Sequence, residues 1–360
     1  MPSKPPRQKP RPRRPSTPAL VAIGLAVGLG LGAASLLRLA GDGGLRYTGV
    51  PRLELPLPPP REASGGFAVE RAVLAVDAAE EPPATLDPAL SEPGPYGPLP
   101  RVGAGGRTPL QAYARRAPRA AGERHRLALL VVDLGLRAEA TEAALALPGA
   151  VSLAFSPYAR NLPRWMARAR RAGHEVLLGL PLEPAEYPDD DPGPHTLLAG
   201  ADAETNLDRL AWLLARGAGY AAVAGGGERF AADAQAPGPV LAELSRRGLA
   251  LVEFGDDRLA AAAAAAELPY ASAPSPVDAA AAAVEIDFIL AGLESRALTA
   301  GSAVGVVEAH PVILDRLRPW LGTLAGKGIL LTPLTALLGD DANLQAERRG
   351  GAGSGVSPQG

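Results

Sequence analysis

Between about residue 127 and residue 338, short apolar runs alternate with amphipathic stretches of helical period. The apolar runs predict buried strands at 127–132, 151–155, 175–180, 220–224, 250–253, 303–307 and 329–331. The stretches between them predict helices at 139–147, 162–172, 207–215, 240–247, 256–268, 276–296 and 312–326. This alternation predicts an α/β fold whose parallel sheet is covered by helices. The number of strands suits a small or irregular barrel, but periodicity does not separate a barrel from an open sheet.

A different pattern marks the start of the chain. Residues 1–17 carry several Lys and Arg but no acid, and residues 18–37 carry no charge at all. About 20 apolar residues span the hydrocarbon core of a bilayer. We therefore expect a basic cytoplasmic tail at 1–17 and one transmembrane anchor at 18–40 in a bacterial inner membrane, with the C-terminal domain in the periplasm. A cleaved signal peptide is the alternative, although the apolar run is long and its cleavage site is poor.

Three glycines in the predicted anchor are spaced four residues apart, at Gly24, Gly28 and Gly32. Small residues on one helical face let two transmembrane helices approach closely, so this stripe is a candidate homodimer seam. The alternative is that glycine is common in membrane helices for other reasons.

The segment at 41–122 is rich in Pro, Gly and Ala and predicts an extended spacer. Within it, residues 108–114 are expected to be more ordered and to pack onto the domain that follows. That domain is placed at 123–340, and a polar, Gly-rich flexible tail at 341–360.

Composition excludes several kinds of function. The net charge of −2 gives no basic surface for a nucleic-acid partner. The chain has no cysteine, which excludes disulfides, thiolate nucleophiles and cysteine-ligated metals. Chemistry in a parallel α/β fold lies at the carboxyl ends of the strands. Five such places carry polar residues or glycine: Asp133, 181–198, 225–229, 254–257 and 308–311.

Motifs at these places resemble those of the divergent polysaccharide deacetylases. The similar segments follow the order of that family and lie at 129–135, 147–159, 172–178, 182–198 and 310–329. Together they cover roughly residues 108–338. The resemblance implies a deformed (β/α) barrel, a link to carbohydrate metabolism, and an ancestral metal-assisted removal of acetyl groups from amino sugars.

The sequence departs from this pattern where the ancestral reaction needs its metal. A divalent metal would polarise the amide carbonyl and activate a water, with a carboxylate as base. The family's first strand ends in two aspartates, whereas this chain has Val132 followed by Asp133. A ligand histidine expected near Gly226 is absent, and Gly179 replaces another histidine common in relatives. The resemblance therefore implies a degenerate site, with Asp133 as the remaining candidate metal ligand.

The remaining candidates each have two readings. Asp133 is either a site residue or a cap of the following turn. His310 and Glu308 are the candidate catalytic side chains, and His310 alternatively only begins a helix. His195, near Asp189–Asp191, either helps to bind a cation or lies in a loop anchored by its prolines. His174 is expected to be structural.

Three functions remain open. The first is an envelope protein that binds a glycan or an envelope protein in the old cleft, with little or no hydrolysis and no cofactor. The second is an active deacetylase with zinc or another divalent metal, using Asp133, Glu228, Glu308 and His310. The third is a structural protein that places a domain at a set height above the membrane.

Overall fold

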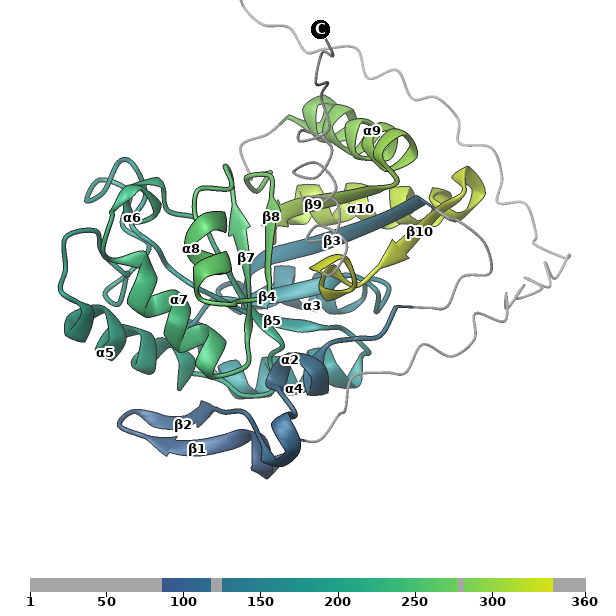
Figure 1. Ribbon diagram of the computed structural model, residues 1–360. Coiled ribbons are helices and arrows are strands. Elements are labelled where there is room, and N and C mark those ends of the chain that lie inside the picture. Colours follow the sequence, from purple (N-terminus) through teal and green to yellow (C-terminus); the bar gives the residue numbers. More distant parts are fainter. Residues whose placement is uncertain (1–85, 118–124, 278–281, 339–360) are drawn as a thin grey trace, which may run out of the picture. The chain divides into compact units, whose positions relative to one another are not determined.

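The computed structural model describes residues 86–117, 125–277 and 282–338 (Figure 1). The predicted basic tail, the anchor at 18–40 with Gly24, Gly28 and Gly32, and the tail at 341–360 lie outside these residues. Within the described part, no helix combines the length and the apolar character that crossing a membrane requires.

The centre of the fold is a near-closed parallel barrel of seven strands in the order β9-β3-β4-β5-β6-β7-β8. The strands are β3 (His125–Leu134), β4 (Ser152–Phe155), β5 (Val176–Gly179), β6 (Ala222–Gly225), β7 (Ala250–Phe254), β8 (Tyr270–Ala273) and β9 (Ser302–Glu308). Beyond β8 the chain reaches β9, because the amide of Val277 donates to the Val306 carbonyl and the Val277 carbonyl accepts from the Glu308 amide, each at 3.0 Å. A further strand, β10 (Ile329–Thr332), pairs with the first residues of β3.

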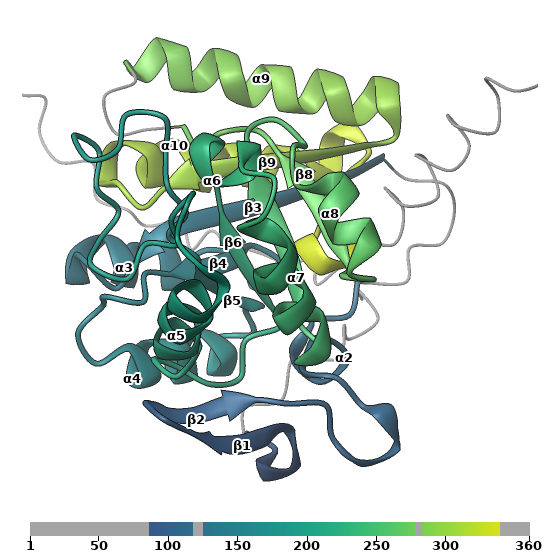
Figure 2. The same ribbon diagram turned by 60° about the vertical axis from the view of Figure 1, so that its left-hand side comes forward.

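Helices cover the outside of the barrel (Figures 1 and 2). They are α3 (Ala138–Leu145), α4 (Leu162–Arg171), α5 (Ala203–Leu214), α6 (Glu228–Ala232), α7 (Pro237–Arg246), α8 (Ala260–Ala265), α9 (Ala283–Ala300) and α10 (Pro311–Thr323). Leucine, valine and phenylalanine fill the layer between sheet and helices. Alanine dominates the barrel interior, because few strands enclose a narrow space that larger side chains would overfill.

The structure differs from the predicted elements at one strand and at the start of one helix of the barrel. Strand β8 was not among the predicted strands, since its sequence Tyr-Ala-Ser-Ala is short and carries little apolar signal. Helix α9 begins at Ala283 and not at Pro276. The reason is that Val277 is extended and pairs with β9, so the proline precedes a barrel-closing bridge and does not start a helix.

The last part of the predicted spacer is folded. Residues 91–100 form an antiparallel hairpin of β1 (Ser91–Gly94) and β2 (Gly97–Pro100). The buried guanidinium of Arg247, just after α7, holds this hairpin by a 3.0 Å ion pair with Glu92 and a 2.8 Å hydrogen bond to the Pro100 carbonyl. The prediction that 108–114 is ordered is confirmed: α2 (Pro109–Tyr113) begins with a capping box, and the Leu110 amide donates to the Gly248 carbonyl at 3.1 Å.

A fully buried carboxylate closes the amino-terminal end of the barrel. Glu175 accepts hydrogen bonds from the Arg115 amide at 3.1 Å, the Ser152 hydroxyl at 3.0 Å and the Thr335 amide at 3.2 Å, and also from the Thr335 hydroxyl. Burial raises the pKa of this carboxyl, and these hydrogen bonds oppose the rise. The short 3₁₀ helix at Leu334–Leu337 is thereby fixed, and its leucines pack among the interior alanines.

Candidate functional site

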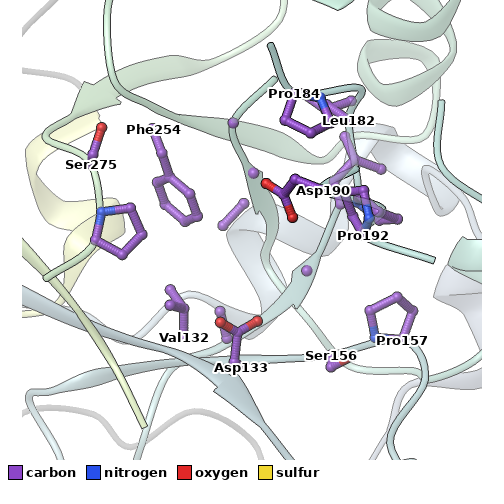
Figure 3. A pocket seen from close by; sticks show the side chains of 18 of the residues that line it. Val132, Asp133, Ser156, Pro157, Leu182, Pro184, Asp190, Pro192, Phe254 and Ser275 are labelled. Atoms are coloured by element: carbon purple, nitrogen blue, oxygen red, sulfur yellow. The ribbon is translucent and has the colours of Figure 1, made fainter. Parts of the chain in front are cut away.

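A cavity of about 420 Å³ lies at the carboxyl ends of the barrel strands (Figure 3). Its walls come from the ends of β3, β4, β6 and β7, from the loop between β5 and α5, and from the segment that follows β8. The residues that line it include Val132, Asp133, Tyr158, Glu186, Asp190, Gly225, Gly226, Glu228 and Phe254. This is the end of the barrel at which the sequence placed the chemistry.

Asp133 reaches this cavity because the end of β3 is irregular. In a regular strand, neighbouring side chains point to opposite faces, so Val132 inside the barrel would send Asp133 outward. The pairing of β3 with β4 shifts register between Val131 and Leu134, and Asp133 has φ = 59°. Aspartate tolerates this left-handed conformation better than most residues. As a result Val132 and Asp133 both face the cavity (Figure 3).

The carboxylate of Asp133 has no hydrogen bond or ion pair to any other described residue. The rim of the barrel strips part of its hydration, and this desolvation raises the pKa of the carboxyl, while the charge of Arg137 opposes the rise. The interpretation of Asp133 as a turn cap is wrong. The turn is held by Thr141, whose hydroxyl accepts from the Gly135 amide at 2.9 Å and donates to the Arg137 carbonyl at 2.7 Å.

The glycines at 225–227 are required by close packing. An added Cβ would lie 2.0 Å from the Leu180 carbonyl oxygen at Gly225, and 2.9 Å from the Phe254 carbonyl oxygen at Gly226. At Gly227 it would lie 2.4 Å from Cβ of Leu182. Neighbouring backbone therefore occupies the space in which a histidine side chain would begin.

The loop between β5 and α5, which forms part of the cavity wall, is held in place by contacts of Glu183. The buried carboxylate of Glu183 accepts from the Ala199 amide at 2.6 Å and pairs with Arg229 of α6 at 3.2 Å. The guanidinium of Arg229 also donates to the Tyr187 carbonyl at 2.7 Å. These contacts hold the part of the loop that contributes Glu186 and Asp190 to the cavity.

His195 anchors the far side of the same loop. Its ring stacks on Trp212 of α5 with centroids 3.6 Å apart and an interplanar angle of 2°. Its amide donates to the Tyr158 hydroxyl at 3.1 Å, and Tyr158 itself lines the cavity. Burial and the nearby Arg209 charge lower the pKa of this imidazole. The reading of an anchored loop thus has a physical basis in an aromatic contact, and not in the prolines alone.

The other predicted site residues lie beside the cavity and not in its wall. Glu308 ends β9 in register with Val132, and His310 precedes the first turn of α10 as its N-cap. Neither of them lines the cavity. Nδ1 of His310 is buried and has no hydrogen-bond partner among the described residues. Their assignment as catalytic side chains stays a prediction.

His174 is structural, as predicted. It is fully buried, and its ring nitrogens lie 2.9 Å from the Val151 carbonyl oxygen and 3.3 Å from that of Leu145. Burial lowers the pKa of this imidazole.

A catalytic zinc ion takes three protein ligands and keeps a fourth position open. Over residues 86–117, 125–277 and 282–338, no three His, Asp or Glu side chains are grouped so that they could hold a metal ion. The donors in this part of the chain therefore do not fit a zinc site, and we assign no chemical step to a metal. Whether Asp133 binds a metal stays a prediction.

Sequence reasoning missed several residues that line the cavity. Tyr158 and Phe254 were not singled out, although both follow predicted strands at the correct end of the barrel. Glu186 and Asp190 lie in the segment 181–198 that the sequence indicated, and Phe254 begins the segment 254–257, but none of them was named as a site residue. The signal that could have found them is their shared place in segments that follow strands β4, β5 and β7.

The model of the family described as "divergent polysaccharide deacetylase" matches residues 129–338. The chain belongs to this family. The crystal structure of an uncharacterized protein from Agrobacterium tumefaciens C58 is similar to this chain at 37% identity and a TM-score of 0.63. The match covers 67% of this chain and 99% of that one.

A mutant of a CE4 family pseudoenzyme with restored enzymatic activity matches at 11% identity and a TM-score of 0.31. That match covers 61% of this chain and 69% of the other. A similarity this low supports no argument about this chain. The comparison with curated proteins found no significant match. The predicted family and the (β/α) barrel are thus confirmed by the family model and by the strand topology.

Proposed function

We propose that this protein is a membrane-anchored envelope protein whose barrel binds a glycan in the rim cavity, with little or no hydrolysis. The observation that carries the proposal is a rim cavity whose carboxylates are not grouped to hold a metal. Membership of a carbohydrate-active family makes a glycan the natural class of ligand.

The cavity offers contacts that suit a sugar. The ring of Phe254 provides an apolar face on which the C–H groups of a pyranose could pack. Carboxylates around it, Asp133 and Asp190 among them, can accept hydrogen bonds from sugar hydroxyls. The fastening of the loop by Glu183 and His195 keeps the wall preorganised, which lowers the entropic cost of binding.

The test uses the full-length protein in a mild detergent, because residues 18–40 are predicted to be membrane-spanning. Oligomers of N-acetylglucosamine, glucosamine and glucose are titrated by calorimetry, and acetate release is measured with added Zn²⁺, Co²⁺ or Mn²⁺. We expect saturable binding of at least one oligomer without acetate release. We also expect less than about 0.1 metal ion per chain after dialysis, because a zinc site needs three ligands.

The opposite result favours an active deacetylase. Stoichiometric metal that is lost in the Asp133→Ala and His310→Ala variants, together with acetate release, would contradict the proposal. It would assign the chemistry to Asp133, Glu228, Glu308 and His310 instead. An absence of binding to every oligomer would favour the purely structural role.

The proposed location is tested separately, and the lack of native cysteine makes the test simple. Gln235 is exposed in the barrel domain, and Ser3 lies in the basic tail. In spheroplasts, a membrane-impermeant maleimide is expected to label Gln235→Cys and to leave Ser3→Cys unlabelled until lysis. Labelling of Ser3→Cys alone would reverse the orientation, and labelling of neither variant would place the barrel in the cytoplasm.

A further inference from the structure

The charge of the cavity wall is one-sided. Four carboxylates line it, those of Asp133, Glu186, Asp190 and Glu228. Its lining residues include no Lys, Arg or His. An anionic ligand, such as a uronic acid or a phosphorylated sugar, would meet only like charge there.

These four carboxylates also lack partners inside the described part of the protein, where no hydrogen bond or ion pair reaches them. Acids just outside the cavity behave differently. Glu183 pairs with Arg229 at 3.2 Å, Glu253 accepts from Tyr270 at 2.5 Å, and Asp233 accepts three backbone N–H groups. These three acids have partners within the protein, whereas the four acids of the cavity wall are exposed and open to a ligand.

Asp133 is the most consequential of the four. Desolvation raises the pKa of its carboxyl, and no described residue donates a hydrogen bond to it, so a cationic ligand would stabilise its charged form. Figure 3 shows its carboxylate and that of Asp190 facing the middle of the cavity from opposite walls. A cationic group bound in the cavity would be attracted by both carboxylates.

We propose that the cavity selects glycans that carry a protonated amine, with Asp133 and Asp190 flanking the ammonium group. This inference rests on the proposed glycan binding and names the class of glycan. The ammonium group provides three N–H donors, which matches two carboxylates that each accept hydrogen bonds. The apolar face of Phe254 takes the ring of the same sugar.

The experiment compares three tetramers on the full-length protein in detergent at pH 6.5: glucosamine, N-acetylglucosamine and glucose, all β-1,4-linked. We expect the glucosamine tetramer to bind about tenfold more tightly than the other two, as one charge-assisted contact would give. Raising the salt from 50 to 500 mM should reduce this ratio, because screening weakens the ion pair.

Asp133→Asn is the decisive variant, since asparagine is also tolerated at positive φ and is nearly isosteric. It should bring the ratio of the glucosamine-tetramer affinity to that of the other two tetramers to about one. Asp190→Asn should lower this ratio by about threefold, since each variant removes one flanking charge. The matched control is Asp315→Asn, which removes an exposed carboxylate on α10 outside the cavity and should leave the ratio unchanged. Circular dichroism and thermal melting check that each variant is folded. If Asp133→Asn does not fold, Asp190→Asn alone tests the inference.

The outcomes separate the two claims. Equal or tighter binding of the N-acetylated or glucose tetramer to the wild-type protein overturns the amine selectivity and leaves glycan binding standing. A preference for glucosamine that persists in both variants also overturns it, because the selectivity would then come from elsewhere. Binding of none of the three tetramers overturns the proposed function and this inference together.

Discussion

Replacing Gly225 by alanine is expected to lower the free energy of unfolding by about 3 kcal/mol. The added methyl group would lie 2.0 Å from the Leu180 carbonyl oxygen, which is backbone and not a side chain that can rotate away. That backbone is itself fixed, since the Leu180 amide donates to the Ala224 carbonyl at 2.8 Å. Two barrel strands must therefore separate, and the melting temperature should fall by roughly 6–12 °C.

Gly292→Ala is the matched control, because the same substitution meets nothing within 4 Å in the exposed interior of α9. Alanine is the better helix former by about 1 kcal/mol, so this variant should be more stable than the wild-type protein. Urea unfolding of the two variants at 25 °C should give changes of opposite sign. A loss of less than about 1 kcal/mol for Gly225→Ala would show that the strands adjust, contrary to the packing argument.

This packing gives a physical account of the missing histidine. The sequence suggested that the loop at 225–227 is a remnant left after a metal ligand disappeared. The structure adds that Leu180, Leu182 and Phe254 occupy the space that a side chain there would need. Reintroducing a histidine at Gly226 would require the β7 end to move before any ligand could form.

Replacing Glu175 by leucine should cost more, about 4 kcal/mol. Leucine fills a similar volume but accepts no hydrogen bond, so the amides of Arg115 and Thr335, both part-buried, would lose their acceptor. Two hydroxyl groups, on Ser152 and Thr335, would lose theirs as well. Each buried donor left without an acceptor costs about 1–3 kcal/mol, and the hydroxyls recover part of this by rotating.

Calorimetric melting of three variants tests this network. Glu175→Gln keeps one acceptor oxygen, so its melting temperature should lie between those of Glu175→Leu and the wild-type protein. Glu204→Leu makes the same change on the exposed face of α5 and should shift stability by less than about 0.5 kcal/mol. If Glu175→Leu melts as the wild-type protein does, the carboxylate is not what holds the barrel's amino-terminal end together.

The sequence predicted those parts of the fold that depend on a regular period. Long apolar strands such as β3 and the amphipathic helices between them were placed within a few residues. Strand β8 was missed because its four residues have little apolar surface and gain their place by pairing with β7. Periodicity did not predict barrel closure, which only the family resemblance implied, since closure depends on the contact of Val277 with β9 and has no local sequence signal.

The candidate site divides in the same way. Asp133 was identified from its position after a strand, but its entry into the cavity depends on a register shift that no period reveals. His310 was chosen by resemblance and Glu308 from its place at a strand end, and both lie next to the cavity wall without forming it. Asp190 and Glu186 come from a loop whose path is set by contacts of Glu183 and His195 with distant helices.

The hairpin at the barrel's amino-terminal end bears on how the domain carries mechanical load. Leu86, where the described chain begins, lies next to Gly219 in the segment that leads into β6, at the end of the barrel remote from the cavity. A pull on the chain from its N-terminal side would first strain the hairpin and its Arg247 ion pair. The rim loops would stay unloaded, so tension applied at Leu86 should leave the shape of the cavity, and hence its affinity for a ligand, unaltered.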